Sequence, residues 1–180
     1  MATQEVTNDT RRRGRRTLVL IALVAVAPIV ASYAAYYLFP RDRHVNYGEL
    51  LPTRPPPDAA ALAEFSGRWV MVVAAPAACN GQCISALYST RQARTIQGRE
   101  MDRIVRVWLV ADEAAPDPAL LAQHPDLVVR RGTLAGWPAG AERIYLVDPL
   151  GNLVLAWPRD PDIKKMSTDI GRLLKASRIG

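Results

Sequence analysis

The only two cysteines of the chain, Cys79 and Cys83, are the residues with the clearest capacity for chemistry. They follow an apolar run that predicts a buried strand and precede a stretch with helical spacing, so we expect them at a strand-to-helix turn. A thiol at a helix N-terminus faces unpaired backbone N–H groups, which stabilise its thiolate. Because a spacing of four residues lets the two sulfurs meet across one helical turn, the pair could form a disulfide or hold a soft ion such as Cu(I).

A purely structural disulfide is the other interpretation of the pair, and an oxidising compartment would permit it. The loop that such a bridge closes has only about five residues, which corresponds to about 2 kcal/mol in the chain-entropy model. A bridge that served stability would do more by closing a longer loop. We therefore favour a redox or metal-binding role for Cys79 and Cys83 over a structural one.

Apolar runs and turn signals predict the elements that position this pair. In order along the chain, they are a buried strand at 68–75, a helix at 83–97, a buried strand at 103–111, a short helix at 120–124, an edge strand at 127–129, a hairpin of strands 144–147 and 153–157, and a closing amphipathic helix capped by Asp160 or Asp162. This order predicts a small α/β domain, and it is the order that a thioredoxin-like domain needs.

Residues 17–39 form a stretch of 23 residues without a charged side chain, interrupted by Pro28. A bilayer core requires about 20 such residues in a helix. Five arginines between positions 11 and 16 precede the stretch, whereas only Arg41 and Arg43 closely follow it, so the N-terminus is expected in the cytoplasm. A cleaved signal peptide is the alternative, but it would have a shorter apolar region, and no convincing cleavage site follows Pro28.

These observations divide the chain into four parts. They are a cytoplasmic basic tail (1–16), a transmembrane helix (17–39), a proline-rich spacer (40–61) and one thioredoxin-like domain (62–180). With the five arginines and two acidic residues of the tail set aside, the remainder carries 18 positive and 15 negative side chains. This near balance, without interleaved aromatic and arginine residues, argues against a nucleic-acid partner. The predicted partner is the membrane.

The exported domain resembles the Sco family of thioredoxin-like, copper-binding proteins that serve the assembly of cytochrome c oxidase. The resemblance covers roughly residues 62–176. It rests on the sequence WVMVV at 69–73, CNGQC at 79–83, the helix that follows, IYLVDPLG at 144–151 and the closing helix. The CxxxC spacing is the specific part, since thioredoxins use CxxC. An N-terminal anchor with an exported domain is also similar to that family.

In that family two cysteines and one histidine bind copper, so the resemblance implies Cys79 and Cys83 as metal ligands. It also implies that they are the catalytic pair if the chain is a thiol–disulfide oxidoreductase. The family's histidine lies a few residues before the hairpin, where this chain has Gly140 or a neighbour instead. We expect His44 near lipid head groups, and His124 in a polar loop with a solvated or capping role. Packing roles are expected for Met71, Met101, Met166 and the four tryptophans.

The resemblance implies a membrane-anchored factor in cytochrome c oxidase assembly. It would act through the CxxxC pair, either as a thiol–disulfide reductant or as a Cu(I) carrier, and its partner would be a respiratory oxidase subunit or an assembly factor. The 20 arginines against 3 lysines are typical of a GC-rich bacterial genome, which favours the inner membrane with the domain in the periplasm. The alternative is a non-catalytic, membrane-tethered interaction module whose cysteines form a structural disulfide.

Overall fold

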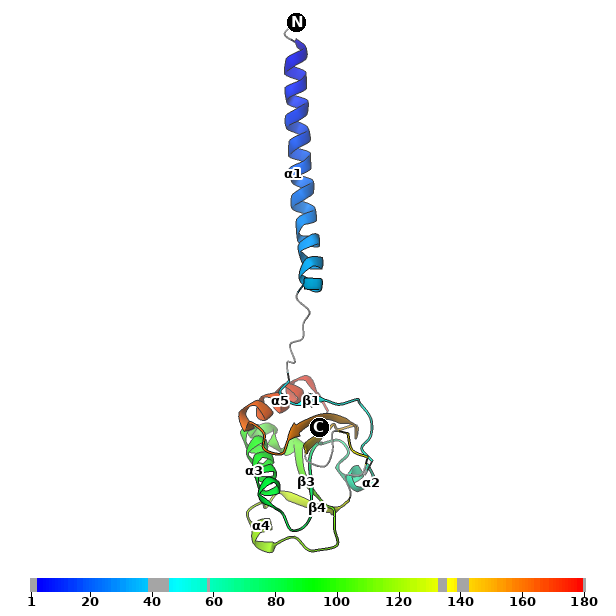
Figure 1. Ribbon diagram of the computed structural model, residues 1–180, viewed down its shortest axis with the longest axis vertical. Helices are drawn as coiled ribbons and strands as arrows, with labels where there is room; N and C mark the ends of the chain where they lie inside the picture. The colour runs from blue at the N-terminus through cyan, green and yellow to red at the C-terminus, as the bar shows by residue number, and fades with distance from the viewer. Residues whose placement is uncertain (1–2, 39–45, 58, 133–135, 139–142, 180) are drawn as a thin grey trace. The chain divides into compact units, whose positions relative to one another are not determined.

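The computed structural model describes residues 3–38, 46–57, 59–132, 136–138 and 143–179. It divides the chain into two compact units, one that holds α1 (Thr3–Leu38) and one that holds all later elements. The elements of the second unit, labelled in part in Figure 1, are β1 (Glu49–Leu50), α2 (Ala59–Leu62), the 3-10 helix η1 (Ala63–Phe65), β2 (Trp69–Ala75), α3 (Gly81–Ile96), the 3-10 helix η2 (Gly98–Arg103), β3 (Ile104–Val110), α4 (Pro118–Ala122), β4 (Leu127–Arg131), β5 (Arg143–Val147), β6 (Leu153–Pro158) and α5 (Ile163–Ala176).

The apolar stretch predicted from the sequence lies in α1. Within this helix, the 23 residues Arg13–Ala35 are long and apolar enough to cross a bilayer, and no part of that window is buried. The helix begins at Thr3, so it also includes most of the predicted basic tail. An apolar helical window of this length that is not buried is typical of a membrane anchor or a signal sequence.

The second unit is built on a six-stranded mixed sheet with the strand order β1-β6-β5-β2-β3-β4. β2, β3 and β4 run parallel, while β5 lies antiparallel beside β2 and forms an antiparallel hairpin with β6. A parallel crossover followed by an antiparallel hairpin is the arrangement that the order of elements predicted. The thioredoxin-like α/β fold is therefore confirmed, with an apolar helix before it.

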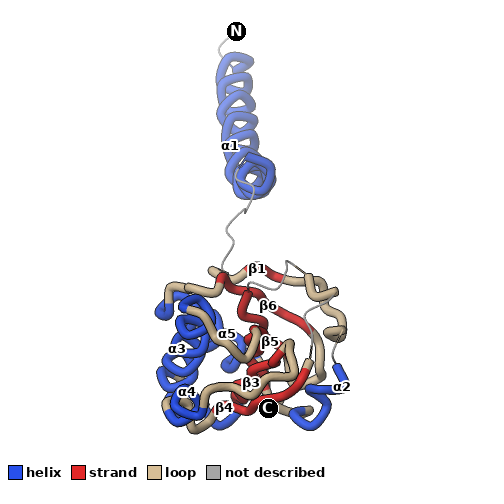
Figure 2. Tube along the Cα trace, turned by 60° about the horizontal axis from the view of Figure 1, so that its bottom comes forward, coloured by secondary structure: helices blue, strands red, loops and turns tan. Residues whose placement is uncertain are grey.

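Helices cover both faces of the sheet, and Figure 2 shows α3, α4 and α5 on one side and α2 on the other. One apolar cluster fills the space between the sheet and α3 and α5, and a second lies on the opposite face around Leu62, Phe65 and Trp137. Every residue of β2 and β3 is buried, because both of their faces are covered. This burial explains why β2 is apolar throughout and why β3 is apolar apart from Arg106.

The segment just before β1 is fastened to the domain by one carboxylate, that of Asp169. Asp169 of α5 accepts hydrogen bonds from the backbone N–H groups of Tyr47 (3.1 Å) and Gly48 (2.8 Å) and from Trp157 Nε1 (3.0 Å). A Cβ atom at Gly48 would lie 2.5 Å from that indole nitrogen, so only glycine fits here. We refer to these four residues as the Asp169 clasp. It lies partly within the segment predicted as a proline-rich spacer, and β1 next to it pairs with β6.

Candidate functional site

Cys79 and Cys83 are joined in a disulfide, with their Cα atoms 5.3 Å apart. The bridge lies between the end of β2 and the first turn of α3, at the strand-to-helix turn that the sequence predicts. Cys79 is partly exposed, whereas only 1% of Cys83 is exposed. A reacting group from solvent therefore reaches Cys79 before Cys83.

Helix α3 begins at Gly81, two residues earlier than predicted, because Asn80 caps it. The Asn80 side chain accepts a hydrogen bond from the Cys83 N–H (3.0 Å), and the Asn80 carbonyl accepts one from the Ile84 N–H (2.9 Å). Asparagine is among the preferred N-cap residues because it satisfies such donors. Cys83 is thus the third residue of the helix, where the positive end of the helix dipole favours a thiolate once the disulfide is reduced.

The loop that leads from β2 to Cys79 is held by Asp112, which lies just after β3. The Asp112 carboxylate accepts from the Ala77 N–H (3.2 and 3.3 Å to its two oxygens) and from the Ala114 N–H (3.2 Å). The Cys79 N–H in turn donates to the Ala77 carbonyl (2.8 Å). Sequence reasoning missed Asp112. Its position was the available signal, since the carboxyl ends of the parallel strands β2 and β3 meet at one edge of the sheet.

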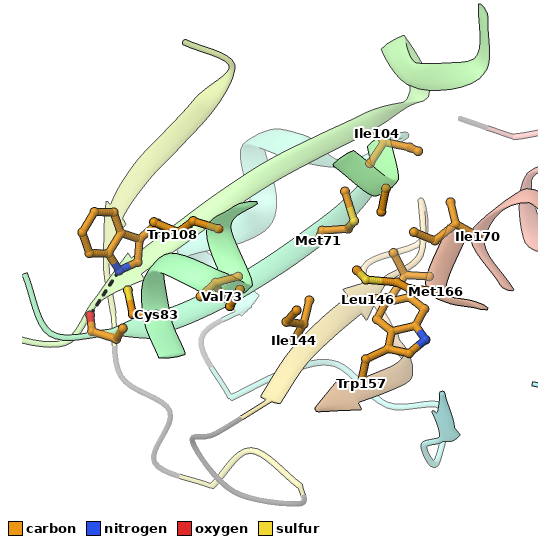
Figure 3. Packing of buried hydrophobic residues seen from close by; sticks show 14 of the residues in the cluster. Met71, Val73, Cys83, Ile104, Trp108, Ile144, Leu146, Trp157, Met166 and Ile170 are labelled. Carbon is orange, nitrogen blue, oxygen red and sulfur yellow. Dashed lines mark hydrogen bonds between the residues drawn. The ribbon is translucent and has the colours of Figure 1, made fainter. Parts of the chain in front are cut away.

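Trp108 of β3 supports the same loop from the protein interior. Its Nε1 donates to the carbonyl of Ala75, the last residue of β2, at 3.3 Å, and Figure 3 shows this bond beside Cys83. Trp108 is fully buried in the apolar cluster that also contains Cys83. Because a buried carbonyl requires a partner, the indole fixes the point at which the chain leaves β2.

The loop between β6 and α5 contacts the site from a third direction. Arg159 donates from Nη2 to the carbonyl of Ala74 in β2 (2.6 Å), and Asp160 accepts from the Ser85 hydroxyl in α3 (2.7 Å). A guanidinium therefore lies at the end of the strand that carries the cysteine loop.

The described residues contain no group of three or more His, Cys, Asp and Glu side chains arranged to hold a metal ion. Gly140, at the position of the family's histidine, and His44 lie outside the part of the chain that the structure describes. His124 is described, and its ring contacts Arg106. Within the described ranges, the donors that fit Cu(I) are the two sulfurs of Cys79 and Cys83 after reduction.

The prediction of a solvated or capping His124 was wrong. Only 4% of His124 is exposed, and its Nδ1 lies 3.3 Å from Nη2 of the fully buried Arg106. Arg106 also donates to the Leu87 carbonyl (2.8 Å) and to the Thr90 hydroxyl (3.2 Å). Burial, together with the positive charges of Arg106 and Arg91, lowers the pKa of His124 to about 4. At neutral pH the imidazole is therefore uncharged and accepts a hydrogen bond from the arginine.

The packing roles expected for methionine and tryptophan are confirmed with one partial exception. Met101, in η2, is partly exposed. The others are buried, and they are Met71, Met166, Trp69, Trp108, Trp137 and Trp157. None of these side chains is therefore a candidate thioether or ring contact for a ligand at the surface.

Comparison with known families gives two matches. A family model described as transmembrane-like, thioredoxin-like, C-terminal domain matches residues 69–177, and one described as transmembrane-like, N-terminal domain matches residues 8–38. No curated protein matches the chain.

Several solved structures are similar to this chain, and among them are Sco proteins. Apo Sco1 from Thermus thermophilus is 18% identical with a TM-score of 0.53, over 75% of this chain and 98% of that one. Yeast Sco1 with copper bound is 17% identical with a TM-score of 0.52, over 72% and 93%. Copper-bound ScoI from Arabidopsis thaliana is 13% identical with a TM-score of 0.51, over 72% and 99%.

At these identities the likeness to solved structures shows the fold alone, which is thioredoxin-like. The family matches go further, since the match to the C-terminal domain covers more than half of the chain and the second match covers most of α1. The chain therefore belongs to the family of transmembrane-like proteins with a thioredoxin-like C-terminal domain.

Proposed function

We propose that the chain is a membrane-anchored thiol–disulfide exchange protein that acts through Cys79 and Cys83. The observation that carries the proposal is the disulfide between a partly exposed Cys79 and a buried Cys83 in the first turn of α3. This arrangement supplies one sulfur that a partner can reach and a second that can resolve a mixed disulfide. Since a bridge across about five residues contributes only about 2 kcal/mol to stability, chemistry is the better explanation for it.

In the reduced state, the Cys79 thiolate attacks one sulfur of a disulfide in the partner. A mixed disulfide forms, and the partner's other sulfur leaves as a thiolate and takes up a proton. The Cys83 thiolate then attacks Cys79 Sγ, so that the mixed disulfide breaks and the partner's second sulfur leaves as a thiol. Two electrons and two protons have passed to the partner, and the chain is oxidised to the Cys79–Cys83 disulfide. A dithiol donor must reduce it before the next cycle.

The surroundings of the pair support this sequence of steps. The N-terminus of α3 favours the thiolates on which both attacks depend. Asp112 and Asn80 hold the cysteine loop through backbone N–H groups, so the loop stays ordered when the disulfide is open. The fold therefore provides both activation and positioning for the exchange.

We further propose that the partner belongs to cytochrome c oxidase assembly, as an oxidase subunit or an assembly factor. The resemblance of the CxxxC domain to the Sco family supports this assignment, and Sco structures with copper bound are among the similar folds. Cu(I) is a second cargo that the site could carry, because two thiolates are favoured ligands for it. The described residues supply only these two donors, which favours electron transfer over copper delivery.

The proposed location is a bacterial inner membrane, with α1 as a single-pass anchor, the N-terminus in the cytoplasm and the domain in the periplasm. Three observations support it: the unburied apolar window of α1, the five arginines that precede it, and a disulfide, which an oxidising compartment favours. A cysteine pair tethered to a membrane in this way is well placed to exchange with a membrane-bound partner.

The test uses the full chain in detergent, reduced and then mixed with a disulfide-bonded peptide as the probe. The Cys83→Ser variant should accumulate a mixed disulfide with the peptide through Cys79, because the resolving sulfur is missing. Cys79→Ser is the matched control and should form little adduct, since the remaining sulfur is buried. Equal adduct formation by both variants would contradict the assigned roles.

Two further measurements separate the alternatives. A wild-type disulfide that resists mild dithiothreitol in the folded chain would favour the non-catalytic interaction module. Titration of the reduced chain with Cu(I) against a competing chelator tests the carrier role, and failure to compete would remove it while leaving electron transfer intact. Full oxidase assembly by a Cys79→Ser, Cys83→Ser double variant in cells would refute both chemical roles.

A further inference from the structure

The outer face of α5 is strongly basic. The chain has only three lysines, and all three, Lys164, Lys165 and Lys175, are exposed on this helix. Arg172 lies in the same sector of the helix at 100° per residue, and Arg178 is exposed just after the helix ends. We refer to these five residues as the basic face.

Few acidic side chains neutralise the basic face. Asp169 is the one acidic residue of α5, and it is 2% exposed because it forms the clasp. Asp162, the N-cap, lies 3.7 Å from Lys165, and the buried Asp169 lies 3.9 Å from Arg172, so two carboxylates are set against the five cations. The opposite side of α5 packs in the core through Met166 and Ile170. The helix therefore presents charge to its surroundings and keeps its apolar side for the domain.

The segment that arrives from α1 is fastened to this same helix. The Tyr47 N–H donates to Asp169, the Tyr47 hydroxyl accepts from the Asp162 N–H (3.1 Å), and Lys165 Nζ lies 5.5 Å from the centre of the Tyr47 ring. Only eight residues, 39–46, separate Tyr47 from the end of α1 at Leu38. Whatever path they follow, they span at most about 30 Å. The tether therefore limits how far α5, like β1, can lie from the end of α1.

We propose that the basic face of α5 binds the anionic phospholipid headgroups of the bilayer that holds α1. The inference rests on the anchor assigned under the proposed function, and it is independent of the redox chemistry. Charge complementarity carries it, since each lysine or arginine near an anionic surface adds attraction that acts within about one Debye length, roughly 8 to 10 Å. Because the apolar side of α5 is buried in the core, the contact is with headgroups and the helix does not insert.

The three lysines supply their own test, because they are the only side-chain amines of the chain. The full chain is placed in nanodiscs of pure phosphatidylcholine or of phosphatidylcholine with phosphatidylglycerol, and is treated with an amine-acetylating reagent in the presence of a reference peptide. Mass spectrometry then gives the acetylation rates of Lys164, Lys165 and Lys175. We expect rates about three-fold or more lower in the anionic discs. Most of this protection should be lost in 0.5 M NaCl, where the Debye length falls to about 4 Å.

Two paired variants test whether the protection of the lysines depends on the basic face or only on the total charge of the chain. Arg172→Gln with Arg178→Gln removes two cations of the face but keeps the three reporting lysines, and it should weaken the protection. The matched control is Arg68→Gln with Arg130→Gln, since both arginines lie against Phe65 on the opposite face of the sheet. This control removes the same charge and should keep the protection.

The outcomes distinguish the two proposals. A chain that does not co-purify with nanodiscs would refute the anchor. A chain that co-purifies, but whose lysines react equally in neutral and anionic discs, would overturn lipid binding by α5 and leave the anchor and the exchange chemistry standing. Equal loss of protection in both variant pairs would also overturn the proposal, because it would show that net charge and not this face is responsible.

Discussion

Replacement of Asp169 by alanine is expected to destabilise the domain strongly. The carboxylate accepts three hydrogen bonds, and two of them, from Gly48 N–H and Trp157 Nε1, are buried. Each buried donor that loses its partner costs about 1–3 kcal/mol, so Asp169→Ala should lower the free energy of unfolding by about 4 kcal/mol. Asp169→Asn should cost about half as much, because the amide oxygen still accepts while its NH₂ group cannot.

The assay is guanidinium unfolding of the full chain in detergent, followed by tryptophan fluorescence. All four tryptophans lie in the domain, so α1 makes no contribution to the signal. With a slope of about 4 kcal/mol per M for a domain of this size, the midpoint should fall by about 1 M for Asp169→Ala. Asp126→Ala, which removes an exposed partner of Arg94, is the control and should shift the midpoint by less than about 0.25 M. A shift of that small size for Asp169→Ala would refute the clasp as a source of stability.

Two further predictions concern a buried histidine and the cysteine loop. The unfolded chain binds a proton at His124 near pH 6.5 and the folded chain only near pH 4, so the free energy of unfolding falls as the pH drops through this window. Guanidinium titrations at pH 7 and pH 4 should show that His124→Gln avoids about 2–3 kcal/mol of that loss. Equal losses in the variant and the wild type would contradict the lowered pKa. Asp112→Ala frees the Ala77 N–H and should destabilise the reduced chain more than the oxidised one, in which the disulfide still holds the loop. The reduction potential of the Cys79–Cys83 disulfide, measured in glutathione buffers, should then become more negative by about 20–40 mV, since 30 mV corresponds to about 1.4 kcal/mol. An unchanged potential would contradict a positioning role for Asp112.

The strands that carry the site were predictable because their whole length is buried. The run 68–75 differs from the observed β2 by one residue at its start, and the run 103–111 differs from β3 by one residue at each end, since strands covered on both faces are apolar over nearly their whole length. The start of α3 was predicted two residues late. The cap that sets it is Asn80, which lies inside the cysteine motif, where the sequence predicts a turn.

The contacts that the sequence did not reveal join residues far apart in the chain. Arg106 interrupts the apolar run of β3 and was the one sign of a buried polar cluster, but its partner His124 lies 18 positions later, beyond any helical or strand period. In the Asp169 clasp, Asp169 binds Gly48 and Tyr47, which lie 121 and 122 positions earlier in the chain. β1 has only two residues, and a strand of that length carries no alternation from which it could be recognised.

The position of β1 at the edge of the sheet has a mechanical consequence. Tension from the membrane would enter the domain where Tyr47 and β1 are attached, and β1 pairs with β6 at only two positions, Glu49 with Ala156 and Leu50 with Leu155. Two strands, β6 and β5, then lie between this edge and β2. A pull would therefore load the Asp169 clasp and then the short pairing of β1 with β6 before it reached the strand that carries the cysteine loop. The domain can thus follow a moving partner without deformation of its disulfide site.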